Sequence, residues 1–279
     1  MTNNDFESII PTAILTAYPR TLTDIPYASE VFDELSKENI PNNLIVEKLA
    51  PEIEARYKLI NKLLKKSSIN QVLEIASGYS TRGINFTKNN NQISYVEIDL
   101  PEVCNKKIDV LNSFTTIPNN LHIISGNALN KKDINKCKQF FDKKSPITVT
   151  NEGLLRYLDF DEKRKVATNI YNLLSKHGGV WITCDITPKK WVVNQDENIV
   201  NFNKNLSNVS DRNNSNWRFE DINHARDFFG QIGFSIESVH PFSEVKEELT
   251  SPEKIGLDSM QVNDLLKDAI VAVMKLKDR

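Results

Sequence analysis

The chain has 279 residues, of which 39% are hydrophobic and 26% are charged, and its formal net charge is −2. This composition is typical of a globular protein with a sizeable core, and it excludes a nucleic-acid partner held by a general positive field. The start of the chain has neither a basic region nor a long apolar run, and no later segment approaches the about 20 apolar residues of a membrane span, so we expect a cytoplasmic protein with no membrane partner.

Cysteine and histidine usage gives no sign of a disulfide framework or a metal site. The three cysteines are far apart in the sequence and odd in number, which indicates free thiols in a reducing compartment. None of the four histidines has the spacing of a metal ligand. We therefore expect no metal.

The N-terminal part of the chain has a helical pattern. The apolar residues of 51–66 recur on one face of a helix. Prolines interrupt the pattern between residues 12 and 66, and each is expected at a helix start or in a turn. We expect residues 1–66 to form an N-terminal helical cap on a core of residues 67–279. The interrupting prolines are Pro19, Pro26, Pro41 and Pro51.

From residue 71 the pattern changes to short apolar runs separated by helical stretches such as 161–176. Strands that alternate with helices predict parallel βαβ units, and hence an α/β fold with a doubly wound, mostly parallel, seven-stranded sheet. The last two runs lie near the C-terminus, where they could form an antiparallel edge. The runs are 71–76, 93–99, 121–125, 146–151, 178–186, 234–240 and 268–276.

The segment 187–218 differs from its surroundings because it is rich in Asn and Lys and weakly patterned. One interpretation is an exposed insertion. The other is a lid over the site, because the segment follows the fifth strand and carries Trp191, Phe202 and Trp217. We expect a lid.

The turn after the first strand is the first place to look for a ligand, since ligands bind beyond the carboxyl ends of the strands in an open parallel sheet. Gly78 permits a positive φ or a close backbone approach. Only Gly78 and Gly83 stand in this turn, which is too few for a dinucleotide fingerprint but suits a ligand without a phosphate, such as S-adenosylmethionine (SAM). A plain strand-to-helix connection is the alternative.

Polar residues also follow the next three strands. Asp99 ends the second strand, where a carboxylate can accept hydrogen bonds from ribose hydroxyls, although a helix N-cap is an alternative. Asn127 and Leu129 follow the third strand and could meet an adenine ring or form an ordinary turn. Glu152 follows the fourth strand beside Gly153, where it could meet the ammonium or the sulfonium of SAM.

Together these motifs resemble the leucine carboxyl methyltransferase family, which includes bacterial polyketide O-methyltransferases. LEIASGYSTRG resembles the family pattern xLGAGxDTRxxR, YVEIDLPEV resembles YxEVDxPEV, and NEGLLRYL resembles AEGLLxYL. TAILTAYPR and PYASEVF resemble N-terminal family motifs, so that the match spans about residues 11–186. The chain departs from the family in having Ala76 for the first Gly, Ser80 for an Asp, and Asn127 for an Asp of many members.

The resemblance implies a class I SAM-dependent O-methyltransferase, and it assigns residues to the parts of SAM. Arg82 and Arg20 would hold the methionine carboxylate, and Glu152 would hold the amino group. Asp99 would bind the ribose. The implied cofactor-binding residues are Arg20, Ala76, Gly78, Arg82, Asp99, Asn127, Ala128, Leu129 and Glu152.

The acceptor implied by the family is a carboxylate or a hydroxyl, either on a small molecule, which could be polyketide-like, or at a protein C-terminus. A carboxylate needs no general base at neutral pH, whereas an alcohol does. The sequence offers no obvious base, which favours an acidic acceptor; Tyr157, His224 and His240 are the candidates for a catalytic group. A non-catalytic SAM-binding or nucleotide-binding Rossmann-like protein is the alternative function.

Overall fold

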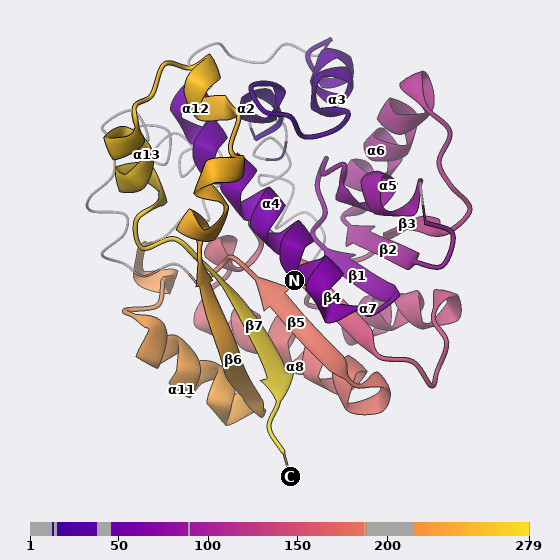
Figure 1. Cartoon of the computed structure of the whole chain (residues 1–279). Coiled ribbons are helices and arrows are strands. Elements are labelled where there is room, and N and C mark those ends of the chain that lie inside the picture. Colours follow the sequence, from indigo (N-terminus) through magenta and orange to yellow (C-terminus); the bar gives the residue numbers. More distant parts are fainter. Residues whose placement is uncertain are drawn as a thin grey trace.

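The computed structural model describes residues 13, 16–37, 46–88, 90–186, 188 and 215–278. Of the lid expected at 187–218, only 188 and 215–218 are among these residues, and Pro41 is not. Figure 1 shows the arrangement of the elements in space. In chain order they are α2 (Ala17–Thr21), α3 (Ala28–Leu35), η3 (Glu47–Leu49), α4 (Ala50–Ser67), β1 (Gln71–Ile75), α5 (Arg82–Thr87), β2 (Ser94–Asp99), α6 (Pro101–Phe114), β3 (Leu121–Ser125), α7 (Lys131–Ile134), η4 (Asn135–Phe140), β4 (Ile147–Asn151), η5 (Leu155–Tyr157), α8 (Phe160–His177), β5 (Gly179–Thr183), η6 (Ser215–Trp217), α11 (Ile222–Ile232), β6 (Phe234–Pro241), η7 (Phe242–Glu248), α12 (Ser251–Lys254), α13 (Ser259–Leu266) and β7 (Ile270–Leu276).

The seven strands form one sheet in the order β3-β2-β1-β4-β5-β7-β6 (Figure 1). Strands β1 to β5 run parallel, whereas β7 is antiparallel to both β5 and β6. This confirms the expected α/β fold with a mostly parallel sheet and an antiparallel edge. The strand order reverses between β1 and β4, so the carboxyl ends of these two strands mark the place where such sheets bind ligands.

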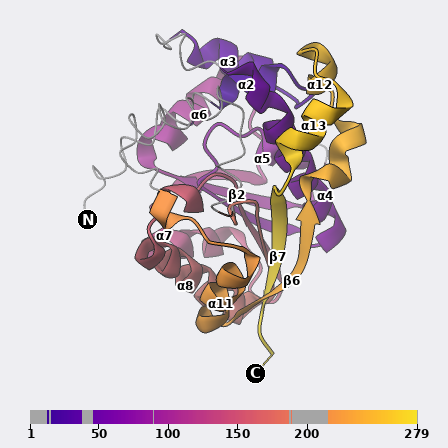
Figure 2. The same cartoon turned by 90° about the vertical axis from the view of Figure 1, so that its left-hand side faces the viewer.

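The central strands are buried because helices cover both faces of the sheet. Every residue of β1 and of β4 is buried, as expected for parallel strands without an exposed face. Figure 2 shows α8 and α11 on one side of the sheet and α4 on the other. The face under α8 and α11 includes Leu73 and Trp181, whereas the face under α4 includes Val72 and Ile182. Residues of opposite parity along each strand therefore fill two separate core layers.

The helices before β1 cover the end of the sheet where the site lies (Figures 1 and 2). Ala17 of α2 and Val31 of α3 share a small apolar cluster with Tyr79 and with Val103 of α6. The first turn of the protein core is thus in direct contact with the N-terminal helices. Since α4 also covers one face of the sheet, the structure does not test the boundary expected between residues 66 and 67, which stays a prediction.

No helix in the described ranges combines the length and the apolar character needed to cross a bilayer.

Candidate functional site

Two adjoining cavities open at the carboxyl ends of β1, β2 and β4. Their empty volumes are about 570 Å³ and about 700 Å³. The smaller has mostly apolar walls, with Ile98, Leu129 and Leu158, and the larger contains the charged groups. The residues that line both cavities are Ala76, Asp99, Leu100, Gly153 and Tyr157.

The turn between β1 and α5 has an unusual backbone. Gly78 has a φ of +50°, as its glycine predicts, but Ala76 also has a positive φ of +55°. The Ala76 amide donates a hydrogen bond of 2.7 Å to the carbonyl of Ile98, which ties the turn to the end of β2. An alanine in this region of φ costs about 1–2 kcal/mol that a glycine does not. The departure from the family's glycine at Ala76 is therefore accommodated at a cost in backbone strain.

Asp99 lies between this turn and the start of α6. Its Oδ2 accepts a hydrogen bond of 2.6 Å from the Gly78 amide, and its Oδ1 accepts one of 2.7 Å from the Leu100 amide. Burial raises the pKa of Asp99, while these two amides oppose the rise. The helix begins at Pro101 with Leu100 as its N-cap, so Asp99 is not the cap itself. Its carboxylate instead fixes the turn and faces both cavities.

The residues expected at the adenine line the smaller cavity. Asn127, Ala128 and Leu129 form part of its wall, together with Leu154 and Leu158. The Asn127 side-chain oxygen accepts a hydrogen bond of 2.9 Å from the Leu129 amide, so the ordinary turn weighed for this segment is present. One lone pair of that oxygen is used by the turn, and the role of Asn127 at an adenine stays a prediction.

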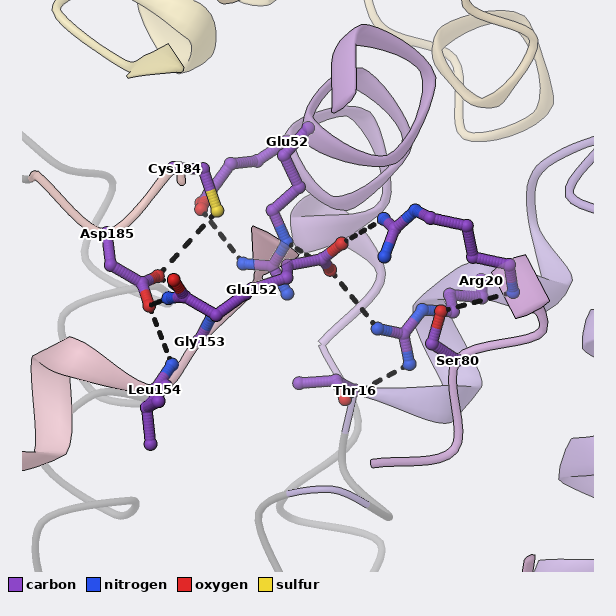
Figure 3. Close-up of polar contacts among 12 residues, drawn as sticks. Thr16, Arg20, Glu52, Ser80, Glu152, Gly153, Leu154, Cys184 and Asp185 are labelled. Carbon is purple, nitrogen blue, oxygen red and sulfur yellow. Dashed lines mark hydrogen bonds and ion pairs between the residues drawn. The ribbon is translucent and has the colours of Figure 1, made fainter. Parts of the chain in front are cut away.

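Glu152 stands at the centre of the larger cavity's charged wall, surrounded by three guanidinium groups (Figure 3). Its Oε1 lies 2.8 Å from Arg56 Nε and 3.3 Å from Arg20 Nη2. Its Oε2 lies 2.6 Å from Arg82 Nη2. Of the three residues that the family resemblance assigns to the amino-acid end of SAM, Arg20 and Arg82 therefore both contact the third, Glu152.

Arg82 is fully buried and is held on three sides. In addition to the contact of Nη2 with Glu152, the Nη1 of Arg82 pairs with the carboxylate of Glu74 in β1. Its Nε donates a hydrogen bond of 2.8 Å to Asn61 Oδ1 in α4. A guanidinium suits this place because its donors diverge in a plane, and a lysine has only one ammonium. Arg82 thus joins α4, β1 and the turn after β4.

Charge and burial act in opposite directions on these groups. Burial raises the pKa of the Glu152 carboxyl, but the guanidiniums of Arg56, Arg82 and Arg20 hold it well below its usual range. Burial lowers the pKa of Arg20, and its neighbouring arginines add to that effect, against the attraction of Glu152. The buried Nε of Arg20 has no hydrogen-bond partner among the described residues. An unsatisfied buried N–H donor on a guanidinium favours an anionic group of a ligand.

Comparison with known proteins decides the family. The model of the family described as leucine carboxyl methyltransferase matches residues 19–171, which is more than half of the 279 residues. The chain belongs to this family. The membership confirms the resemblance expected from the motifs, and it makes the protein a methyltransferase.

Solved structures of other proteins share the fold of this family member at low sequence identity. A DUF574 family protein from Streptomyces avermitilis is 14% identical, with a TM-score of 0.61 and coverage of 96% of this chain and 97% of that one. A putative methyltransferase from Thermobifida fusca is 13% identical, with a TM-score of 0.54 and coverage of 98% and 95%. A structure of PigF with SAH is 14% identical, with a TM-score of 0.50 and coverage of 95% and 62%. None of the curated proteins compared with the methyltransferase matches it significantly.

Of the three candidates for a catalytic group in the methyltransferase, one lines the cavities and two do not. Tyr157 lines both of them. His224 instead accepts a hydrogen bond of 3.2 Å from the Glu220 amide and stacks on Phe160. The Nδ1 of His240 lies 3.0 Å from Oε1 of Glu244. No histidine lines either cavity, and the described residues contain no group of His, Cys, Asp or Glu able to hold a metal ion.

Four residues of the site were missed by reasoning from the sequence. Arg56 and Asn61 come from α4, for which the apolar spacing predicted only a packing face. Glu52 and Arg56 are four residues apart, and such a pair is typical of a solvated helix surface. The spacing therefore did not indicate that the charge of Arg56 is buried. Glu74 lies inside an apolar run, where an acidic residue in a buried strand was the signal that could have been used. Asp185, which lies two residues after the end of β5, is the fourth residue that was missed.

Proposed function

We propose that this methyltransferase moves the methyl group of SAM to an oxygen that is already ionised at neutral pH, either a carboxylate or an acidic hydroxyl. The observation that carries the proposal is the position of Glu152 and Arg20 beside Asp99 on two adjoining cavities, with the buried Arg82 holding Glu152 from outside the cavity linings. The arginine and glutamate side chains offer opposite charges for a zwitterionic amino acid, and the Asp99 carboxylate offers an acceptor for a pair of hydroxyls. SAM contains both an amino-acid part and a ribose with two hydroxyls.

Each part of the cofactor meets suitable chemistry in these cavities. The unsatisfied Nε of Arg20 fits the methionine carboxylate, and Glu152 fits the ammonium group. Asp99 retains lone pairs for ribose hydroxyls, since each of its oxygens accepts one amide. The apolar walls at Leu129 and Leu158 fit the adenine ring. PigF, which shares the fold, is described with SAH, the product left by SAM.

SAM, when bound, supplies a methyl group on a sulfonium sulfur that is already a good leaving group. The residues of the chain then have to orient the acceptor oxygen and keep water out, which can supply most of the rate gain. The absence of a histidine from the two cavity linings supports an acceptor that needs no base. Small acids, including polyketide-like ones, and the C-terminal carboxylate of a protein fit this requirement.

The N-terminal helices would complete the site as a cap. Arg20 of α2 reaches Glu152, and Thr16 and Arg20 line the larger cavity. We therefore infer that residues 1–66 help to enclose the amino-acid end of the cofactor. The lid expected at 187–218 lies almost entirely outside the described residues and stays a prediction.

Calorimetry with SAM, SAH and NAD on the full chain tests the cofactor. SAM and SAH should bind and, at saturating concentration, raise the free energy of unfolding by about 2–4 kcal/mol, whereas NAD should not. Absence of SAM binding at millimolar concentration would contradict the proposal. Small carboxylic acids, acidic phenols and C-terminal peptides should then be screened by mass spectrometry for the gain of one methyl group, with simple alcohols as controls.

A further inference from the structure

The carboxylate of Asp185 lies against the turn that follows β4 (Figure 3). Asp185 is buried, with 7% of its surface exposed, and comes two residues after the end of β5. Its Oδ1 accepts a hydrogen bond of 2.8 Å from the Gly153 amide, and its Oδ2 accepts bonds of 2.7 and 2.9 Å from the Leu154 and Leu155 amides. Three successive backbone donors therefore converge on one side chain.

The local backbone is shaped for this arrangement. Gly153 has a φ of +80°, which turns consecutive amides toward one side of the chain and so forms a nest for an anion. A fourth donor, Asn151 Nδ2, lies 2.6 Å from Asp185 Oδ2. The oxygen of the same Asn151 amide accepts a bond of 2.7 Å from the indole of Trp181. Without the carboxylate, three buried or half-buried amides would lose their partner, at a cost that a native turn avoids.

Glu152 lies immediately before these three amides, and its own carboxylate points to the arginines rather than to Asp185 (Figure 3). The backbone from which the Glu152 side chain projects is thus fixed by a residue that has no part in the arginine cluster. We propose that Asp185 is a positioning residue, which holds Glu152 in the orientation that receives the amino group of SAM. This inference rests on the proposed function.

An asparagine at this place would test the charge and the acceptors without changing the volume. Its amide has one acceptor oxygen, and its nitrogen would face a backbone donor. Asp185→Asn should therefore release part of the turn and let Glu152 rotate away. The adenine cavity is lined by residues after β2 and β3, which Asp185 does not contact, but also by Gly153 and Leu154, whose amides it holds, so some effect on the nucleoside is expected.

The decisive measurement compares two ligands by calorimetry on Asp185→Asn. SAH carries the amino-acid part, whereas 5′-methylthioadenosine has the same nucleoside without it. We expect the affinity for SAH to fall about tenfold or more and the affinity for 5′-methylthioadenosine to fall by a clearly smaller factor, because only Gly153 and Leu154 of the adenine cavity depend on Asp185. In a Glu152→Gln background, Asp185→Asn should cause little further loss for SAH, because the two residues act through the same contact.

Two further variants serve as a control and as an alternative to Asp185→Asn. Asp258→Asn is the matched control, because Asp258 also accepts two backbone amides, at the N-cap of α13, but is exposed and outside both cavities. It should leave both affinities unchanged. If Asp185→Asn does not fold, Asn151→Ser removes the Asn151 amide donor and should give the same selective loss at smaller size.

Equal losses for both ligands in the Asp185 or Asn151 variant would overturn the inference and leave Asp185 a purely structural residue. An unchanged affinity for SAH in folded Asp185→Asn would overturn it as well. If the wild-type protein bound neither ligand, the proposed function would fail, and the inference would fail with it. These outcomes are distinguishable because the wild type is measured first.

Discussion

Arg82 Nη2 and Glu152 Oε2 lie 2.6 Å apart, although the two residues are 70 positions apart in the chain. They follow β1 and β4, which pair with Ile75 opposite Asn151. This is the point where the strand order of the sheet reverses. The ion pair therefore joins the two halves of the sheet beside the larger cavity, whose lining includes Ala76 after β1 and Glu152 after β4, so that a ligand in this cavity meets both halves at once.

Replacing Arg82 with lysine should weaken cofactor binding. A lysine cannot contact Glu74, Asn61 and Glu152 together, so Glu152 would lose its fixed position. We expect Arg82→Lys to cost about 1–3 kcal/mol in SAH affinity by calorimetry. Arg226→Lys, on the exposed side of α11, is the control and should bind normally. Normal binding by Arg82→Lys would show that Arg82 serves folding alone.

Asp99→Asn should affect the nucleoside part of the cofactor. The change removes one of the two oxygens that hold the Gly78 and Leu100 amides and that would face the ribose. We expect about 1–3 kcal/mol of lost affinity for SAH and a similar loss for 5′-methylthioadenosine. Asp109→Asn, on the exposed face of α6, is the control. Retention of wild-type affinity for both ligands would rule out the ribose role.

The rate of methyl transfer should be flat from about pH 6 to 9 once an acceptor is known. A carboxylate acceptor has a reference pKa near ~4 and is ionised throughout this range. His224→Ala and His240→Ala should leave the profile unchanged, because neither histidine lines a cavity. A rise in rate through an ionisation near pH 6–7 that is lost in one of these variants would refute the base-free mechanism and name the base.

A second buried ion pair should make stability depend on pH. Lys107 Nζ lies 2.6 Å from Glu97 Oε2 beneath the first turn, and burial raises the pKa of Glu97 to about 7, against the pull of Lys107. Between its usual pKa and about 7, the folded state binds more protons than the unfolded state. The free energy of unfolding should therefore fall, by about 1–3 kcal/mol, as the pH rises through this window.

Chemical denaturation at several pH values checks this dependence. Glu97→Leu combined with Lys107→Met should remove this contribution. Glu34→Gln with Lys37→Gln, which deletes an exposed ion pair, should leave it in place. The same slope in all three proteins would mean that Glu97 does not titrate in this range.

The strands were predictable because each is a short apolar run, and the central strands β1 and β4 are buried on both faces. The run 121–125 matches β3, and the run 146–151 exceeds β4 by one residue. The run 178–186 extends three residues beyond β5, since hydrophobicity continues into the connection that holds Asp185. Periodicity does not show where the sheet stops and the site begins.

The turns of the site were predictable as a set, but their contacts were not. Asp99, Asn127 and Glu152 follow three parallel strands, and topology alone brings them to one edge of the sheet. Arg56 and Asp185 stayed hidden because their roles depend on contacts with residues far away in sequence. A helix pattern does not distinguish an arginine in water from one that reaches a buried carboxylate.

The hydrogen-bonded line from Trp181 to Asn151 to Asp185 also gives the protein an optical probe. The indole is fully buried, and three successive hydrogen bonds connect it through Asn151 and Asp185 to the Gly153 amide beside Glu152. Tryptophan emission responds to the polarity and hydrogen bonding around the ring, so a movement of this turn changes the signal from inside the core. With Trp191 and Trp217 replaced by phenylalanine, the one remaining tryptophan, excited at a wavelength that tyrosine does not absorb, reports the state of the turn without any attached dye.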